Sequence, residues 1–485
     1  MQQVLNEATG PAPLSLTDDL RRRFIEAAGA GGAITDPTDI AAFTEDWRGT
    51  KTGNSPLVLR PADTQALSAI VRLANETRTP LVPQGGNTSL CGASVPEAEG
   101  AVIISLQRMN RIRTLDAAGM SVTAEAGVIL QTLHEEAAKA DRMFPLSLGA
   151  KGSATIGGLI STNAGGTQVL RYGTMRAQVL GLEAVLPDGS VLDQLTPLRK
   201  DNTGYDIKQL LIGAEGTLGF VTAASLRLLP APKQVATAFA GLAAPEDALT
   251  LLTRMQAETG GVIDSFELVP RIAIDLVTQH VPGTRDPFAQ SYPWYVLIEL
   301  TSSQPGAELP EILERALVAA LEDGTIADTV VAQSETQRED FWRLRETIAE
   351  GERADGPSLK HDISVPVADM PRFVTEVGDA IEARWPGAAM FSFGHLGDGN
   401  IHFNVRSEED RLPRADLMAK HDEIAAFVYD RIADYGGSIS AEHGIGTLKA
   451  GELARIGDPA KLVAMRAVKQ ALDPHGIMNP GKLFA

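Results

Sequence analysis

The chain has 485 residues, of which 44% are hydrophobic and 22% are charged. This size and composition suit about three globular domains and exclude a small module, a collagen and a largely disordered protein. The formal net charge of −19 disfavours a nucleic acid as partner, because a polyanion would be repelled. Cys91 is the single cysteine, which excludes a disulfide framework and a cysteine-ligated metal cluster within one subunit.

The first twenty residues, MQQVLNEATGPAPLSLTDDL, do not follow the basic, apolar and small-residue order of a secretory signal peptide. The sequence also contains no uncharged apolar window of about 18 residues. We therefore expect no transmembrane segment and a cytoplasmic location.

The first elements in chain order suggest a helical start and then a βαβ unit. Residues 17–29 predict a helix with Thr17 as N-cap and Gly29 at its end. Residues 56–60 and 79–83 resemble strands, and Thr64 is expected to cap the helix between them. Apolar residues of that helix follow a period of three to four, as expected for a helix with one buried face: Leu67, Ile70, Val71 and Ala74.

Further strands and then longer helices follow. Strand-like runs occur at 101–106, 121–126 and 179–186, and Pro187-Asp188-Gly189 predicts a hairpin into 190–192. Beyond the sequence LLPAP at 228–232, amphipathic helices are expected at 246–259, 309–321 and 461–472. We expect an α+β protein divided into a helical segment 1–50, an α/β domain 51–232, an α+β domain 233–437 and a C-terminal segment 438–485.

Glycine runs stand out in the α/β region, at 84–89, 149–158 and 162–166. None follows the G-x-G-x-x-G pattern of a Rossmann fingerprint, and Leu483 replaces the Ser or Thr that a P-loop needs near the C-terminus. Residues 83–89 follow a strand and combine two glycines with small polar residues. Such a loop is either a tight turn or a cradle in which backbone N–H groups bind an anion such as a pyrophosphate.

A histidine pair is predicted on one hairpin. In FSFGHLGDGNIHFNV, residues 391–405, Asp398-Gly399 is a preferred pair for a two-residue type I′ turn. That turn would place His395 opposite His402, close enough for both imidazoles to bind one divalent cation. Asn404 is expected on the same face.

The best third ligand is Glu442 in SAEHGIG, where flanking glycines allow a tight bend. Two histidines and one carboxylate with open positions suit a catalytic zinc, manganese or iron ion. The neighbouring His443 would point elsewhere and could act as a base. Arg345 and Lys360 carry no signal of their own and, from the residues alone, are surface charges.

The motifs together resemble a known family. QGGNTS, LGAKGS followed by IGG, TNAGG with RYGT, and DNTGYDIKQLLIGAEGTLG resemble the FAD-binding domain of the vanillyl-alcohol-oxidase-type flavoproteins. GHLGDGNIHFNV, SAEHGIG and DPHGIMNPGKLF are similar to the branch that contains D-lactate and D-2-hydroxyglutarate dehydrogenases, and LGAKGS and LRKDNTGYD favour the latter. The resemblance covers about residues 40–485.

The resemblance implies an FAD that lies across the glycine-rich loops and is not covalently bound, because the first loop contains no histidine. It also implies that the C-terminal Asn479 reaches the flavin. The other residues implied to bind FAD are Pro83, Gly85, Gly86, Asn87, Thr88, Ser153, Gly157, Gly158, Thr162, Asn163, Gly166, Tyr172, Gly173, Glu215, Gly216 and Val221.

The resemblance also assigns roles at the second site. It implies His395, His402 and Glu442 as metal ligands, with zinc as the first candidate, and His443 as the catalytic base that also contacts substrate. Arg345, Lys360 and Asn404 would bind the substrate, the first two through its carboxylates. Ala349 departs from the family pattern, because a Thr is expected four residues after the carboxylate-binding Arg.

The activity implied is oxidation of a D-2-hydroxy acid, first of all D-2-hydroxyglutarate, with hydride transfer from C2 to flavin N5. Because of Ala349, D-lactate and D-malate remain alternatives. A flavin-dependent alkyl transferase and a non-catalytic FAD-domain subunit are the more distant ones. An electron-transfer flavoprotein or a quinone is the expected acceptor, and a homodimer is a family-level expectation.

Overall fold

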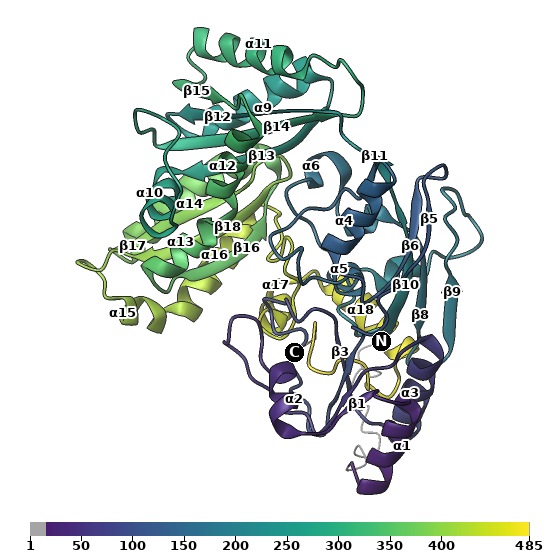
Figure 1. The fold of residues 1–485 in the computed structure, drawn as a ribbon. Coiled ribbons are helices and arrows are strands. Elements are labelled where there is room, and N and C mark those ends of the chain that lie inside the picture. The colour runs from purple at the N-terminus through teal and green to yellow at the C-terminus, as the bar shows by residue number, and fades with distance from the viewer. Residues whose placement is uncertain (1–15, 485) are drawn as a thin grey trace.

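The computed structural model describes residues 16–484, and in them three large sheets follow one another along the chain (Figure 1). Helices pack against each sheet, so the α+β class expected from the sequence is confirmed. The prediction that the first twenty residues form no secretory signal peptide concerns mainly residues 1–15, which lie outside the described residues. Among the described residues, no helix is long and apolar enough to span a membrane.

The first sheet has four short strands in the order β1-β2-β4-β3. Its elements are α1 (Asp18–Ala28), β1 (Ala33–Ile34), α2 (Pro37–Thr44), β2 (Val58–Leu59), α3 (Thr64–Thr77), β3 (Leu81–Gln84) and β4 (Val102–Ser105). The expected helix cap at Thr17 is confirmed, since its side chain accepts a bond from Leu20 N–H. The cap of α3 is Asp63, however, and not Thr64. Asp63 accepts the N–H of Ala66, and a carboxylate is among the best N-caps.

The second sheet is antiparallel, with five strands in the order β5-β6-β10-β8-β9. Its strands are β5 (Ile112–Asp116), β6 (Ser121–Glu125), β8 (Val179–Val185), β9 (Val191–Gln194) and β10 (Phe220–Arg227). Short helices connect them: α4 (Leu130–Lys139), α5 (Ile156–Thr162), α6 (Val169–Tyr172), α7 (Met175–Gln178) and α8 (Lys208–Leu211). A two-stranded ribbon pairs β7 (Arg142–Met143), which follows α4, with β11 (Leu229–Pro230), which lies just before the third sheet in the chain. The hairpin predicted at 187–189 joins β8 to β9.

The third sheet has seven antiparallel strands in the order β15-β12-β14-β13-β17-β18-β16. They are β12 (Gln234–Leu242), β13 (Ile263–Pro270), β14 (Trp294–Ser302), β15 (Asp328–Val331), β16 (Leu359–Ser364), β17 (Ala388–His395) and β18 (Asn400–Ser407). The helices that surround it are α9 (Pro245–Thr259), α10 (Arg271–His280), α11 (Leu309–Glu322), α12 (Glu335–Glu346), α13 (Ile348–Asp355), α14 (Met370–Arg384), α15 (Arg414–Ala419) and α16 (His421–Asp434), with a 3₁₀ turn at Val367–Asp369.

Apolar cores cover both faces of this sheet, because successive strand residues point to opposite faces. Phe403 and Val405 belong to the core beneath α9, α11, α14 and α16. Phe391 and Phe393 belong to a second core with residues of α10, α12 and α13. His402 and Asn404 share the face of Phe391 and Phe393. The predicted site residues His402 and Asn404 therefore lie on the face that packs against α10, α12 and α13, at the edge made by β17, β18 and β16.

The C-terminal segment returns to the first sheet (Figure 1). After the loop at 438–449 come α17 (Ala450–Ile456) and α18 (Pro459–Leu472). The final residues then run beside β3, where Met478 forms an isolated parallel bridge with Leu81. Ile477 and Met478 are buried in the core of the first sheet. The helix predicted at 461–472 is confirmed, whereas the division into segments 1–50, 51–232, 233–437 and 438–485 stays a prediction.

Candidate active site

The histidine hairpin forms, but in another register than the one expected. His402 lies opposite Phe393, and His395 lies opposite Asn400. The turn is therefore the four residues Leu396–Gly399. A type I′ turn needs positive φ at both central residues; Gly399 has φ +81°, but Asp398 is not in that region. The prediction that His395 faces His402 directly is wrong. The two rings still share a face as diagonal neighbours, with centroids 5.7 Å apart.

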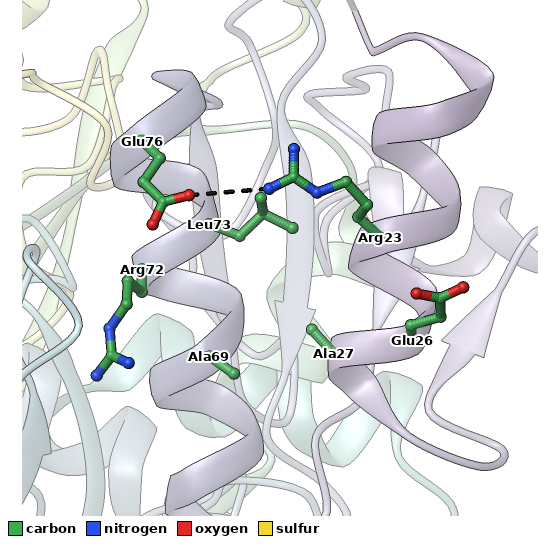
Figure 2. Close-up of a pocket in the computed structure, with 7 residues that line it drawn as sticks. All are labelled: Arg23, Glu26, Ala27, Ala69, Arg72, Leu73 and Glu76. Atoms are coloured by element: carbon green, nitrogen blue, oxygen red, sulfur yellow. Dashed lines mark ion pairs between the residues drawn. The ribbon is translucent and has the colours of Figure 1, made fainter.

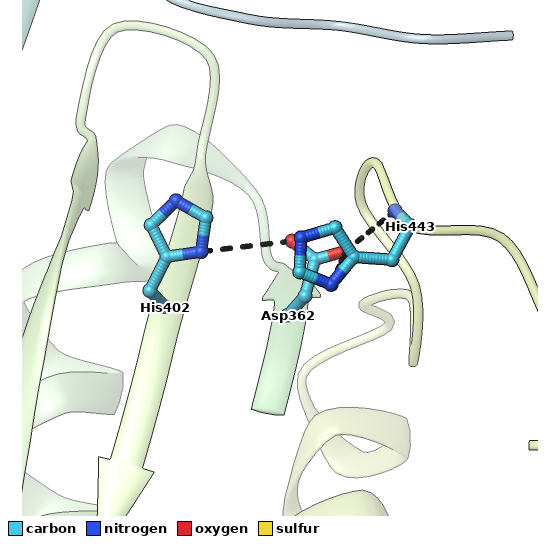
Figure 3. A group of neighbouring side chains, drawn as sticks. All are labelled: Asp362, His402 and His443. Carbon is cyan, nitrogen blue, oxygen red and sulfur yellow. Dashed lines mark hydrogen bonds and ion pairs between the residues drawn. The ribbon is translucent and has the colours of Figure 1, made fainter. Parts of the chain in front are cut away.

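The loop that carries Glu442 and His443 is fixed by Asp362 of β16. One carboxylate oxygen of Asp362 accepts the backbone N–H groups of both residues, at 2.9 and 2.8 Å. Figure 3 shows Asp362 with His402 on one side and the backbone of the His443 loop on the other; the ring nitrogens Nδ1 of His402 and His443 lie 3.9 and 3.6 Å from its oxygens. Burial would raise the pKa of Asp362, but the neighbouring cationic groups and the backbone N–H bond lower it well below its usual range.

The three predicted ligands come together. Ligand atoms of His395, His402 and Glu442 all lie within 4.8 Å of one another, and His395 Nε2 is 4.0 Å from a Glu442 oxygen. A second group, Asp362, His402 and His443, meets the same criterion and shares His402. Imidazoles and carboxylates are the donors of catalytic zinc sites, so the donor chemistry of both groups suits a divalent ion.

Glu267 of β13 orients one of these histidines. Its buried carboxylate lies 2.7 Å from Nδ1 of His395, which leaves Nε2 facing Glu442. Metal-binding histidines commonly have such a carboxylate behind the ring. Burial lowers the pKa of His395, but Glu267 outweighs it and raises the pKa to about 9. Burial would raise the pKa of Glu267, and the charges of His395 and Arg345 hold it at about 2.

Burial sets the ionisation of the loop residues. It raises the pKa of Glu442 to about 7, with His395 opposing the shift. It lowers the pKa of His443 to about 4, with Asp362 opposing. His443 is therefore a neutral imidazole at neutral pH, which is the state that can accept a proton.

Three cation or amide groups line the same face. Arg345 of α12 is buried, which corrects the surface position that its residue type alone suggested. Its Nε donates to Glu267 at 2.8 Å, and its guanidinium lies 5.0 Å over the Phe393 ring. Nη2 of Arg345 also lies 2.8 Å from the Glu267 carboxylate, so the two side chains form a buried ion pair. Lys360 and Asn404 lie opposite each other on the neighbouring strands β16 and β18. Ala349, which departs from the family pattern, is exposed.

The glycine-rich loops pack against one another without room for side chains. A Cβ on Gly85 would lie 2.2 Å from Thr155 Oγ1, and one on Gly86 would lie 2.0 Å from the Ser153 carbonyl oxygen. Thr155 Oγ1 and Asn479 Oδ1 are buried and lack hydrogen-bond partners in the described chain. Close backbone approach and unsatisfied polar atoms are what a polar ligand against these loops would use.

The other predicted loop residues fall into two groups. Glu215 uses its side chain inside the protein: its carboxylate accepts the N–H groups of Ile445 and Gly446, both at 2.7 Å. Asn479 donates to the carbonyl oxygen of Glu215 at 2.7 Å. Val221 is buried in the core of the second sheet. Gly216 lies between α8 and β10, where an added Cβ would lie 2.2 Å from Cγ of Pro83. The remaining positions lie in β3 and the glycine loop after it, in α5 and the turn after it, or around α6: Pro83, Asn87, Thr88, Gly157, Gly158, Thr162, Asn163, Gly166, Tyr172 and Gly173.

Four charged residues at the site were missed from the sequence: Glu267, Glu352, Asp362 and Lys449. Lys449 is buried and donates to the carbonyl oxygens of Asp362 and Ile439. For Asp362 a signal existed, since it follows Lys360 by two residues in a strand-like run and therefore shares its face. The others come from distant elements, with no local pattern.

The surface hollows do not mark this site. A shallow groove between α1 and α3 is lined by seven residues (Figure 2), among them Arg23 and Glu76, whose charged groups are 3.8 Å apart. A second hollow lies near Trp294 and Met390. None of the predicted site residues lines either hollow.

Comparisons with known proteins agree with this arrangement. Residues 55–194 match a family described as FAD binding domain, and residues 231–483 match one described as FAD linked oxidases, C-terminal domain. The mitochondrial D-2-hydroxyglutarate dehydrogenases of Arabidopsis thaliana and Bos taurus are each 39% identical, over 95% and 97% of this chain and 80% and 85% of theirs. A Schizosaccharomyces pombe protein named as a mitochondrial D-lactate dehydrogenase is 37% identical over 92% of this chain and 85% of its own.

The chain belongs to the D-2-hydroxyglutarate dehydrogenase family of FAD-linked oxidases. Solved structures agree on the fold. p-Cresol methylhydroxylase superposes with a TM-score of 0.74 at 14% identity, over 95% of each chain. Alkyldihydroxyacetonephosphate synthase superposes with a TM-score of 0.70 at 16% identity, over 97% of this chain and 86% of that one. The fold type expected from the sequence, that of the vanillyl-alcohol-oxidase flavoproteins, is confirmed.

The cytoplasmic location expected from the sequence is contradicted, because the Arabidopsis, cattle and fission yeast relatives are named as mitochondrial proteins. That expectation rested on the lack of a secretory signal peptide. Such a lack does not bear on mitochondrial import, whose transit peptides are amphipathic and follow another pattern.

We predict that Gly86→Ala lowers FAD affinity by about tenfold or more, because overpacking of this kind costs about 1–3 kcal/mol. The new methyl group would meet the Ser153 carbonyl oxygen and push the two loops apart. FAD retained per polypeptide and the dissociation constant for added FAD measure the effect. Gly451→Ala is the control, since nothing lies within 4 Å of its added Cβ; equal FAD affinity in both variants would contradict the loop assignment.

Proposed function

We propose that the protein oxidises a D-2-hydroxy acid to the 2-oxo acid, using non-covalent FAD and a divalent metal ion. The observation that carries the proposal is the meeting, on one sheet face, of His395, His402 and Glu442 with the neutral imidazole of His443. The family to which the chain belongs supports it.

The chain's own residues bind and orient the substrate. Arg345 is suited to the carboxylate beside the reacting carbon, because its planar guanidinium binds carboxylates in two-point fashion and lies over the Phe393 ring on this face, held from behind by Glu267. His443 accepts the proton of the 2-hydroxyl group, and Asn404 and Lys360 contact the rest of the molecule. A fixed orientation brings the C2 hydrogen to its reaction distance.

The absent groups supply the remaining chemistry. FAD would supply N5 of its flavin as the acceptor of the hydride from C2. The loops at 83–88 and 153–166, Glu215, Gly216, Val221 and Asn479 would hold it. A metal ion on His395, His402 and Glu442 would act as a Lewis acid that favours loss of the hydroxyl proton; zinc is our first candidate, and manganese and iron suit the same donors.

D-2-hydroxyglutarate, giving 2-oxoglutarate, is the substrate that the relatives' names favour. D-lactate and D-malate are the alternatives, since Ala349 brings no hydroxyl group for a distal carboxylate. An alkyl transfer is less favoured, because that relationship rests on a structure only 16% identical. We further propose an electron-transfer flavoprotein or a quinone as electron acceptor, and a homodimer.

The first test is stereospecific reduction of the flavin. Purified protein is mixed without oxygen with D-2-hydroxyglutarate, D-malate or D-lactate, and with each L-form. We expect at least one D-acid to bleach the flavin absorbance and yield its 2-oxo acid, and the L-forms to react far more slowly. If no D-acid bleaches the flavin, the result contradicts the proposed oxidation and favours the alkyl-transfer or the non-catalytic alternative.

His443→Ala is expected to lower the rate of flavin reduction by about 10²-fold or more, the usual effect of losing a general base. FAD content should not change. His421→Ala is the matched control, because His421 is exposed on α16. A reduction rate within about threefold of wild type for His443→Ala would show that another group takes the proton.

A further inference from the structure

Lys360 lies two residues from Asp362 on β16 and therefore on the same face of the sheet as the candidate metal ligands. The pair Lys360–Asn404 follows the pair Asp362–His402 along β16 and β18, a spacing of about 7 Å. Arg345 lies at the other end, because it contacts Phe393 and shares Glu267 with His395. A substrate held by its 2-hydroxyl at the metal ligands and by its carboxylate at Arg345 therefore points its far end toward Lys360.

Lys360 already forms an ion pair with a buried carboxylate of the protein. Glu352 of α13 has a side chain only 4% exposed and lies 2.6 Å from Nζ of Lys360. It also accepts Nδ2 of Asn404, at 3.0 and 3.1 Å, and the hydroxyl of Ser358, at 2.6 Å. Both carboxylate oxygens have partners, so Glu352 is a fixed part of this end of the site.

This pairing changes what the far end can attract. Lys360 alone would draw a second carboxylate, whereas Lys360 with Glu352 carries no net charge. A substrate carboxylate at Lys360 would also compete with Glu352 for the same ammonium and amide groups. Placing two carboxylates side by side is unfavourable, because like charges repel, and here one of them would be the buried Glu352.

We propose that Glu352 determines specificity by cancelling the attraction of Lys360 for a second carboxylate. The site then takes D-2-hydroxy monocarboxylates with an uncharged side chain as readily as a dicarboxylate of the same length. This inference rests on the proposed oxidation of D-2-hydroxy acids and goes further by naming the side-chain class.

The experiment compares two acids of equal chain length, D-2-hydroxyglutarate and D-2-hydroxypentanoate. For each, kcat/KM is measured with an artificial electron acceptor, and the ratio of dicarboxylate to monocarboxylate is calculated. We expect a wild-type ratio within about tenfold of one. Glu352→Gln should raise the ratio about tenfold or more, through a lower KM for the dicarboxylate, as one unit charge a few ångströms away implies at an effective dielectric constant of about 20.

Two further variants keep the test sharp. Glu350→Gln makes the same charge change on the exposed side of α13 and should leave the ratio as in wild type. Lys360→Gln leaves Glu352 without its cation, so the ratio should fall about tenfold. If Glu352→Gln fails to retain FAD, the wild-type ratio decides the matter, because a value above about 100 would mean that Glu352 does not cancel the attraction of Lys360 for a second carboxylate.

A wild-type ratio above about 100 that Glu352→Gln leaves unchanged or lowers would overturn the inference. So would an equal change of kcat/KM for both acids, because Lys360 would then bind the carboxylate that they share. Failure of the proposed function looks different: neither acid would reduce the flavin of the wild-type protein.

Discussion

The buried carboxylate of Asp362 connects every part of the candidate active site. It accepts the backbone N–H groups of Glu442 and His443, lies near the rings of His402 and His443, and accepts Nδ2 of Asn400 at the end of the hairpin. A buried charge is tolerated only with such partners. Without it, the loop would lose the anchor that places a ligand and a base beside the hairpin histidines.

A second carboxylate holds the same loop from the opposite side. Glu215 lies between α8 and β10 and accepts the N–H groups of Ile445 and Gly446. Its backbone has φ +49°, a conformation that costs a non-glycine residue about 1 kcal/mol or more. The two bonds help to offset this strain. The loop is thus fixed between Asp362 of the third sheet and Glu215, whose backbone N–H bonds to the carbonyl oxygen of Ser161 in α5.

Local patterns in the sequence predicted many of the elements and the grouping of His395, His402 and Glu442, and long-range contacts explain what they missed. The helix at 17–29, the βαβ unit and the hairpin histidines all follow from short-range periodicity and turn residues. The register failed because Asp398-Gly399 suggests a two-residue turn, whereas the chain forms a four-residue turn closed by bonds to the His395 carbonyl oxygen. Glu267 and Glu352 carry no local signal, since their partners lie on other elements.

Two ligand groups overlap at His402, and they give His443 different roles. With the metal ion on His395, His402 and Glu442, His443 stays free to accept a proton. With the ion on Asp362, His402 and His443, His443 is a metal ligand and cannot accept the proton. Anomalous X-ray diffraction from crystals of the purified protein distinguishes them directly. The account predicts a metal peak bonded to His395, His402 and Glu442; a peak bonded to Asp362 and His443 would contradict it.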